Sequence, residues 1–411
     1  MFAQIPAPSP NSAALYTDQT NGMTSDEAVR SALKNNDGFL ALLKEAEAAE
    51  RMVDQADQRA RINVGANGLQ QTFGKSHRYT IQASMPLELG GRRKARVLVA
   101  EREAIIKRKR VEQGESEIAT QVRRKFGETL AKISSLILTD EMLAVTLESY
   151  RLVQGRVREG KTAPLEESMW LVEVNRLRSV REVDNSNVQI ALLDLKSVIG
   201  IPPETPLKLR GDLNGSLTNF PTLAELTNQA LKTRPDLLLL RAMENLADAK
   251  IEKAKKDGKF DATATLGYQR LRISDSVQFN YVVFGMNFTL PYRNNSRDAI
   301  EANVLDKQAT EKRRLFGELV VRQEVAKALT HYTSAVRAKE IIRLGVVEQA
   351  ESNLEVVRKT YEFGSSSLLE YLAEQRKYIE FKNSLINAEL AVYLAKIEVQ
   401  RAIFAPELIT K

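Results

Sequence analysis

Four short segments of the chain alternate between apolar and polar residues, which is the pattern of β-strands that present two different faces. The clearest runs from Arg78 to Met85 and reads RYTIQASM, so that Tyr, Ile, Ala and Met share one face. The segments form two pairs: residues 62–73 and 78–89 flank the turn residues GKSH, and residues 261–273 and 277–291 flank SDS. The pattern predicts two β-hairpins, each apolar on one face and small or polar on the other.

The rest of the chain has the periodicity of long helices. No proline occurs between residues 92 and 163 or between residues 292 and 405. Uninterrupted helices of about 65 residues would each be roughly 100 Å long. In the last helix every seventh position is apolar, which predicts a coiled-coil seam made of Tyr371, Tyr378, Leu385, Val392 and Val399.

Each long helix is expected to reverse direction once. The first reversal is REGKTAP, which runs from Arg158 to Pro164, and the second lies at residues 363–367 within EFGSSS. Gly160 and Gly364 suit the left-handed conformation that ends a helix. Thr162 or Pro164 can start the helix after the first reversal, and serines can cap the helix after the second.

The same order of parts occurs twice, which indicates an internal duplication. An amphipathic helix precedes each hairpin, and in the first copy it spans residues 25–60. Residues of the first copy recur at one offset in the second: Thr24, Glu27, Ala32 and Leu33 return as Thr222, Glu225, Ala230 and Leu231. The predicted divisions are an extended tail (1–23), a first repeat (24–200), an irregular linker (201–221), a second repeat (222–405) and a C-terminal tail (406–411).

Composition excludes several classes of site. The 411 residues contain no cysteine and two histidines, so disulfides, thiolate metal sites and HExxH motifs are absent from the sequence. The net charge of +7 is spread over interleaved basic and acidic residues, which indicates a solvated helix surface and no nucleic-acid partner. No catalytic, metal-binding or cofactor-binding arrangement emerges. The start, MFAQIPAPSP, does not read as a signal peptide and fits the tail of a processed chain.

The hairpins point to a membrane. Transmembrane strands need about 9–11 residues with one lipid-facing side, and the four segments meet this requirement. A sheet of four strands cannot close, and its open edges would leave backbone groups unpaired in lipid. Two copies would give eight strands and three would give twelve, and eight would leave no wide pore. Oligomerisation is therefore expected if the strands span a membrane.

The order of helix, hairpin, proline, long helix, glycine turn and helix, repeated twice, resembles the TolC family of outer-membrane efflux proteins. The motifs that carry the resemblance are SDEAVRSALKNN, MPLELGGRRKAR, LKTRPDLLLLRA and YEFGSSSLLEYLAEQRKYIEFKNSLINAEL. ELGGRRKAR is most similar to the CzcC-like branch that is associated with heavy-metal and related RND pumps. The likeness extends from about Thr24 to about Phe404.

The resemblance implies a mainly helical fold with a small β part, in which four strands per chain build a twelve-stranded barrel in a homotrimer. It places the protein in the outer membrane of a Gram-negative bacterium, with a helical barrel extending into the periplasm. The implied partners are outer-membrane lipid, a periplasmic adaptor (membrane fusion protein) and an inner-membrane pump. The implied function is a passive exit duct for metal ions or small toxic compounds.

The resemblance also assigns roles at the helix reversals. Family members carry a tyrosine and an arginine that lock the channel entrance at the positions of Tyr361 and Ser366, and acidic rings at the positions of Glu370 and Ala373. This chain keeps the tyrosine and one acid. We expect Glu370 either to form a cation-selecting ring of three carboxylates or to cap its own helix. Glu166 is its counterpart in the first repeat.

The exposed reversals are the expected docking sites for the adaptor, through Gly160, Lys161, Thr162, Gly364 and Ser365. Two other functions fit the same pattern. One is an exit duct for type I protein secretion, and the other is a soluble coiled-coil scaffold whose hairpins form a small cap. The sequence does not identify the cargo, because a passive duct needs no tight substrate site.

Overall fold

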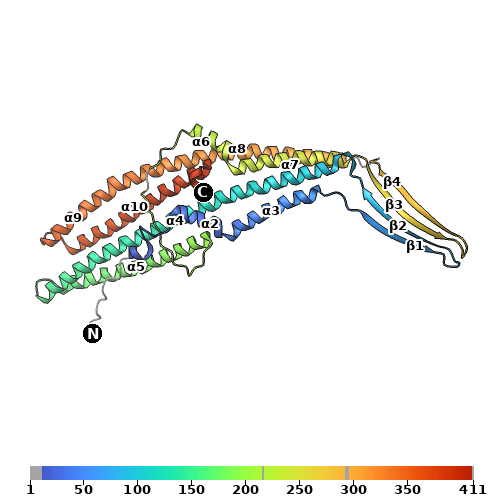
Figure 1. Cartoon of the computed structure of the whole chain (residues 1–411). Coiled ribbons are helices and arrows are strands. Elements are labelled where there is room, and N and C mark those ends of the chain that lie inside the picture. The colour runs from blue at the N-terminus through green and yellow to red at the C-terminus, as the bar shows by residue number, and fades with distance from the viewer. Residues whose placement is uncertain (1–11, 215–216, 292–295, 410–411) are drawn as a thin grey trace. The chain divides into compact units, whose positions relative to one another are not determined.

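The computed structural model describes residues 12–214, 217–291 and 296–409 (Figure 1). Helices account for most of these residues, and four strands form one sheet. The elements in chain order are α1 (Ser12–Tyr16), α2 (Ser25–Asn35), α3 (Asp37–Asp57), β1 (Asn63–Gln70), β2 (His77–Pro86), η1 (Leu89–Gly91), α4 (Arg92–Arg158), α5 (Pro164–Ile199), α6 (Leu223–Thr233), α7 (Pro235–Asp257), β3 (Asp261–Arg272), β4 (Gln278–Thr289), α8 (Arg297–Glu340), the π-helix η2 (Ile341–Val347), α9 (Glu348–Glu362), α10 (Leu368–Ile403) and η3 (Pro406–Leu408).

The chain divides into two compact units. The helical unit comprises Met1–Ala41, Glu112–Arg234 and Leu319–Lys411, and the sheet unit comprises Leu42–Val111 and Pro235–Glu318. Each unit contains segments from both halves of the sequence, so the two predicted repeats contribute to both units.

The sheet unit contains both predicted hairpins, and the prediction of four strands is confirmed. The strands lie side by side in the order β1, β2, β3, β4, and every pair is antiparallel (Figure 1). The pairing of β2 with β3 joins the two hairpins into one sheet, so that Ile81 lies opposite Tyr268, which in turn lies opposite Val282. Strand bounds differ from the predicted segments by a few residues at each end.

The core of the helical unit forms where α2, α4, α5 and α10 bury their apolar stripes together. Its centre contains Val29, Phe126, Leu136, Leu195 and Ile199, each at most 2% exposed. Each half of the chain enters its first helix through a capping box, Thr24 with Glu27 and Thr222 with Glu225, in which the hydroxyl accepts from the glutamate N–H. Four of the five predicted seam positions in α10 are buried.

The predicted helix over residues 25–60 differs from the structure in two respects, because it is broken at Asn36 and ends at Asp57. The Asn36 side chain accepts a hydrogen bond from Phe39 N at 3.1 Å and donates to the Val198 carbonyl at 3.0 Å. An asparagine that satisfies its hydrogen bonds in this way favours a cap over a continuous helix. In the second half, Pro235 starts α7 after the same kind of break.

The absence of proline predicted that the second long helix would be uninterrupted, and this prediction is wrong. A π-helical stretch, Ile341–Val347, separates α8 from α9. The first long helix, α4, is continuous over 67 residues. The two halves therefore differ in the middle of their longest helix.

The chain ends are more ordered than the tails expected from the sequence. Residues 1–11 lie outside the described residues, but Ser12–Tyr16 is helical and Leu209 of the linker forms bridges with Thr17 and Met23. At the other end, Leu408 is fully buried in the core of the helical unit. The bridges to Leu209 hold the first end to the helical unit, and the burial of Leu408 holds the second.

Candidate functional site: the sheet face and the paired helix turns

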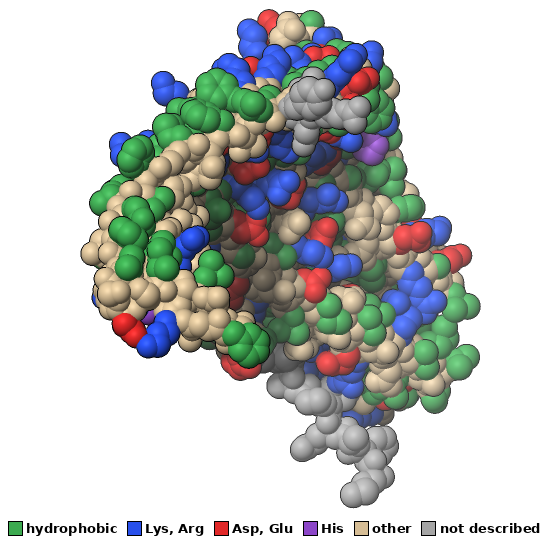
Figure 2. Space-filling view, turned by 90° about the vertical axis from the view of Figure 1, so that its right-hand side faces the viewer, with side chains coloured by type: hydrophobic (Ala, Val, Ile, Leu, Met, Phe, Trp, Pro, Cys, Tyr) green, Lys and Arg blue, Asp and Glu red, His purple; other side chains and the backbone are tan. Residues whose placement is uncertain are grey.

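One face of the sheet exposes large apolar side chains, and we call it the apolar sheet face. The register places these residues on one side of all four strands: Val64, Tyr79, Ile81, Met85, Leu266, Tyr268, Val282, Phe284, Met286 and Phe288. The exposed fraction reaches 83% for Phe284. Figure 2 shows hydrophobic side chains over the outer side of the curved sheet. Such a surface marks a contact with lipid or protein.

The opposite face of the sheet is mostly small or polar. Thr263, Thr265, Gly267 and Gln269 alternate with the apolar positions of β3. Strand β4 departs from the prediction near its start, because its residues on this face include aromatic ones (Phe279 and Tyr281). Leu69 of β1 also lies on this face and is 65% exposed, so the two faces are most distinct in β2.

The sheet has two open edges within the described chain, β1 and β4. Because neighbouring strands alternate in direction, β1 and β4 run antiparallel to each other. A β1 edge can thus pair with the β4 edge of another copy in the same antiparallel manner that holds the sheet together.

The first helix turn follows α4. Gly160 has φ +71°, its N–H donates to the Val157 carbonyl at 3.0 Å, and the Lys161 N–H donates to the Arg156 carbonyl at 2.9 Å. These two bonds close the end of the helix in the predicted left-handed cap. Pro164 is the first residue of α5, and Ala163 before it offers no side-chain cap.

The second helix turn follows α9 and has the same glycine geometry. Gly364 has φ +77°, and its N–H donates to the Tyr361 carbonyl at 2.9 Å. Here the next helix is capped: Ser367 Oγ accepts from Glu370 N at 3.3 Å, and Glu370 Oε2 accepts from Ser367 N at 3.0 Å. Glu370 is thus a helix-capping residue, and its role in a ring of carboxylates stays a prediction.

The structure brings the two turns together through Tyr361. Its hydroxyl donates to Glu166 Oε2 at 3.2 Å, so a residue of α9 contacts a residue of α5. The Tyr361 ring stacks on Tyr371 at a centroid distance of 5.7 Å, and Tyr371 packs against Trp170 at 5.7 Å. Burial raises the pKa of the Tyr361 phenol above its ordinary value; the nearby Trp170 indole opposes this shift and Glu166 adds to it.

A buried ion cluster fixes α5 to α10 beside these aromatic rings. Glu173 is fully buried, and its two oxygens accept from Arg176 Nη2 and Arg376 Nη2, each at 2.6 Å. Burial alone would raise the pKa of Glu173, but the hydrogen bonds and charges of the two guanidinium groups outweigh it and lower the pKa. The carboxylate is therefore ionised and holds both arginines.

Sequence reasoning missed this cluster, although a signal was present. Trp170, Val174 and Leu177 follow helical spacing and are buried, and Glu173 lies on the same stripe. An acidic residue on an apolar stripe, followed by an arginine three residues later, is the pattern of a paired buried charge.

The other predicted site residues lie at or beside the turns. The Ser366 hydroxyl is 2.9 Å from that of Thr360, and Lys161 pairs with Glu159 at 2.6 Å. Thr162 and Ser366 are half-buried, and the exposed residues are Gly160, Lys161, Gly364, Ser365, Glu370 and Ala373. The structure thus joins Tyr361 with Glu166 but leaves Ser366 and Ala373 without a link to the other turn among the described residues.

Two further findings concern the described residues as a whole. None of their helices combines the length and the apolar character that a bilayer crossing requires. Within the same residues, no three acidic or histidine side chains converge as metal ligands would.

The fold is that of outer-membrane channel proteins. A membrane protein from Pseudomonas aeruginosa superimposes with a TM-score of 0.77 at 19% sequence identity, over 98% of this chain and 96% of that one. The Campylobacter jejuni CmeC outer membrane channel also gives 0.77, at 13% identity, over 98% of this chain and 94% of its own.

The model of the outer membrane efflux protein family matches residues 28–200 and 226–405, and the chain belongs to this family. The cobalt-zinc-cadmium resistance protein CzcC of Cupriavidus metallidurans is 22% identical over 380 residues, which are 92% of this chain and 89% of CzcC. The resemblance drawn from the sequence is confirmed. The protein is an outer-membrane channel of a Gram-negative bacterium that extends into the periplasm, in a family of channels and not of enzymes. This membership sets aside the soluble scaffold.

Proposed function

We propose that three copies of the chain form a passive duct through the outer membrane and across the periplasm. The duct receives its cargo through a periplasmic adaptor from an inner-membrane pump, which the resemblance to the CzcC-like branch assigns to the RND class. It exports metal ions or small toxic compounds.

The observation that carries this proposal is the open, two-faced sheet. Its apolar sheet face is matched to lipid, and its opposite face carries threonine, glycine and glutamine that suit a water-filled interior. A backbone group left unpaired in lipid costs several kcal/mol, so the edges β1 and β4 require partners. Other copies of the same chain supply them.

The width of the pore favours three copies over two. Two copies would give eight strands, whose interior side chains fill such a barrel. Three copies would give twelve strands and leave an open passage. Three is also the number that the family resemblance implies.

The helix turns are proposed to face the adaptor. Both turns are exposed at Gly160 and Gly364, and Tyr361 holds them together within one chain. A trimer would present six turns, of two kinds. The inner-membrane pump supplies the energy, and the duct itself moves nothing against a gradient.

The class of cargo is proposed from the relative CzcC, whose name records resistance to cobalt, zinc and cadmium. The described residues hold no cluster of metal ligands. Metal ions would therefore pass through without being retained, as a duct requires.

Cross-linking across the proposed seam tests this function. The chain has no cysteine, and a side chain added at Gly65 of β1 or at Gly285 of β4 meets no atom within 4 Å. In the variant carrying both Gly65→Cys and Gly285→Cys, a flexible bis-maleimide reagent should produce linked dimers and trimers of the protein in detergent. The same preparation should conduct ions in a planar bilayer.

The matched controls are the two single-cysteine variants, which should give far less linked product because identical positions lie apart around a ring. A double variant that stays monomeric and an unmodified protein that gives no conductance would overturn the proposal.

A further inference from the structure

Basic residues gather at one end of the sheet, where the strands join the helices. The stretches 57–61, 88–96 and 252–261 together contain ten Lys and Arg residues and five Asp and Glu residues. The register brings these stretches side by side, because Asn63 lies opposite Ser84 and Pro86 lies opposite Thr263. The excess of positive charge is therefore concentrated at one rim of the sheet.

All five acidic residues of these stretches are already paired. Asp57 pairs with Arg93 and Asp261 with Arg92, at 2.8 and 2.9 Å. The remaining pairs are Glu88 with Arg96, Asp257 with Lys253, and Glu252 with Lys255 and Lys256. These pairs leave the rest of the rim without carboxylate partners.

Four cations of the rim have no ion pair or hydrogen-bond partner among the described residues, and we call them the rim cations: Arg59, Arg61, Lys94 and Lys259. All four side chains are exposed. Positive charges gathered at one end of the sheet raise the local potential, which attracts an anion. The exposed, unpaired cations of the rim can therefore bind a negatively charged partner.

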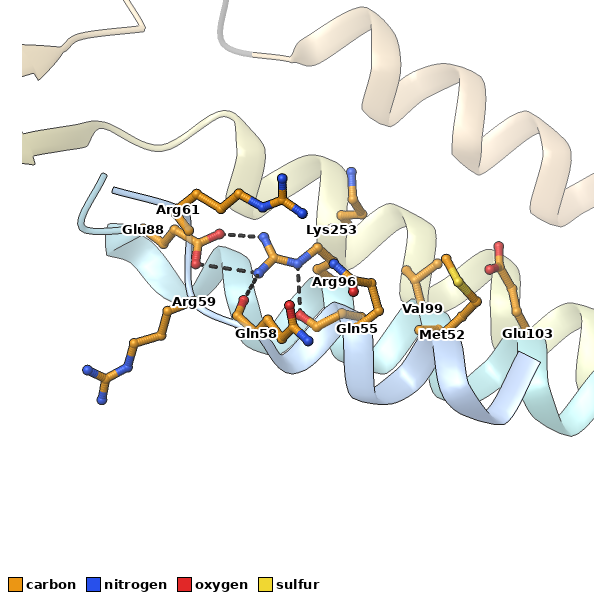
Figure 3. Close-up of a pocket in the computed structure, with 13 residues that line it drawn as sticks. Met52, Gln55, Gln58, Arg59, Arg61, Glu88, Arg96, Val99, Glu103 and Lys253 are labelled. Carbon is orange, nitrogen blue, oxygen red and sulfur yellow. Dashed lines mark hydrogen bonds and ion pairs between the residues drawn. The ribbon is translucent and has the colours of Figure 1, made fainter. Parts of the chain in front are cut away.

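A pocket gives part of the rim a fixed shape. It has a volume of about 490 Å³, and Arg59, Arg61, Arg96 and Lys253 are among its lining residues (Figure 3). The Arg96 guanidinium is held by the Ala56 and Gln58 carbonyls, each at 2.9 Å, and by Glu88. In Figure 3, Arg61 extends over the pocket and Arg59 points away from it. Both guanidinium groups can therefore reach an anion at the surface.

Exposed apolar residues adjoin the rim cations. Ile62 follows Arg61 and Phe260 follows Lys259, and these two apolar side chains are 60% and 49% exposed. Immediately beyond them begins the apolar sheet face. A sequence of cation, exposed apolar residue and lipid-facing strand is the order expected across the boundary between headgroups and hydrocarbon.

We propose that the rim cations bind the phosphate groups of anionic phospholipids in the leaflet of the outer membrane that faces the periplasm. This inference rests on the proposed function, since it requires the strands to span the membrane. The strand ends that join the helices then lie on the periplasmic side. Arginine is well suited to this ligand, because its planar guanidinium donates two hydrogen bonds to one phosphate. The spread of the cations along a rim fits several headgroups better than one free phosphate ion.

Lipid retention by the full-length protein in detergent provides the test. Native mass spectrometry would measure binding of phosphatidylglycerol and of zwitterionic phosphatidylcholine to the unmodified protein and to the Arg59→Gln, Arg61→Gln double variant. Each cation contributes about fivefold to binding of an anionic surface. The double variant should therefore bind phosphatidylglycerol more than tenfold more weakly, with phosphatidylcholine unaffected.

The chain offers a matched control on α8. Lys312 and Arg313 are also exposed and without a described ion pair, but they lie well inside a helix. The Lys312→Gln, Arg313→Gln variant should retain phosphatidylglycerol normally. The charge-preserving Arg59→Lys, Arg61→Lys variant should lose less binding than the glutamine variant, because it keeps the charge and gives up only the paired hydrogen bonds. Inorganic phosphate added at tens of millimolar should displace little of the bound lipid.

The outcomes separate this proposal from the proposed function. A trimeric, conducting protein that binds both lipids equally, or whose rim variant binds phosphatidylglycerol as the unmodified protein does, overturns the headgroup site alone. Full displacement by inorganic phosphate would also overturn it, in favour of a site for the free ion. A protein that neither forms trimers nor conducts overturns both.

Discussion

Glu166 and Glu370 occupy the same position in the two helix turns, six residues after Gly160 and Gly364, yet their carboxylates have different partners. Glu370 accepts from the backbone N–H of Ser367 and completes a capping box. Glu166 instead accepts from the Tyr361 hydroxyl and so connects α5 with α9.

The difference follows from one residue before the helix. Ser367 offers a hydroxyl at the N-cap position, whereas the corresponding residue in the first turn is Ala163. Without a serine or threonine at this position no capping box can form, and the glutamate is available for a partner outside its own helix. A single small residue therefore decides whether the carboxylate acts locally or between helices.

The same division continues further along the two helices. Trp170 and Glu173 are buried, whereas Glu374 and Lys377, at the same distances after the second glycine, pair with each other near the surface. Both helices contribute to the shared core, α5 with Trp170 and α10 with Tyr371, but they do so from positions that are not equivalent. Equivalent positions in a duplicated chain need not share a role.

The largest effect is expected from the buried carboxylate. Replacement Glu173→Gln removes the charge that holds Arg176 and Arg376 and should lower the free energy of unfolding by about 2–3 kcal/mol at pH 7. Because the pKa of Glu173 is lowered in the folded protein, its stabilisation is complete above about pH 4.5 and is lost as the pH falls through the folded-state pKa. Thermal unfolding at pH 7 and pH 3 measures the difference.

The control for this variant is Lys377→Gln, at the equivalent position of the second helix. Lys377 is exposed and pairs with Glu374 at 3.3 Å, so its replacement should change stability by less than about 1 kcal/mol. Equal losses for Glu173→Gln and Lys377→Gln at pH 7, or a loss for Glu173→Gln that persists unchanged at pH 3, would contradict the role of the ion cluster.

An intermediate effect is expected from the N-cap residues. The Ser367→Ala variant should be less stable by about 1 kcal/mol, because it removes the hydroxyl that accepts from Glu370 N. The reciprocal Ala163→Ser variant should gain little, since a new capping box would draw Glu166 away from Tyr361. Chemical denaturation of both variants compares the two turns directly. A loss for Ser367→Ala matched by an equal gain for Ala163→Ser would show that the bond to Tyr361 contributes nothing.

The smallest effect is expected from the bond between the turns. The Tyr361→Phe variant retains the stacking on Tyr371 and loses only the hydrogen bond to Glu166, so stability should fall by about 0.5–1 kcal/mol. Tyr371→Phe, which removes a hydroxyl for which the described residues show no hydrogen bond, should be near neutral in thermal unfolding. If both variants lose the same amount, the hydroxyl of Tyr361 has no special role.

The sequence predicted the fold where a pattern persists over many residues. The strands β1 to β4 and the turn glycines were found because alternation and left-handed helix ends are encoded locally. The breaks at Asn36 and at Ile341–Val347 were missed, because each depends on contacts or hydrogen bonding that a periodic pattern does not reveal.

The candidate site was only partly predictable. Tyr361 and Glu166 are 195 residues apart in the sequence, and only the packing of α9 against α5 brings them into contact. Capping by Glu370 was one of the two roles that the sequence left open, and it was visible there because the serine is three residues away. Glu173 was missed because its partner Arg376 lies on another helix, 203 residues away in the sequence. Residue spacing within one helix cannot reveal such a pair.

The π-helical stretch between α8 and α9 makes the direction of the helix beyond it sensitive to chain length. A π-turn holds about one residue more than an α-turn, so inserting or deleting one residue there rotates everything beyond it by about 100° around the helix axis. The stretch separates the angular setting of α9 and its turn from that of α8. The direction of the second turn is therefore adjustable by the length of its own helix, without any change in the first turn.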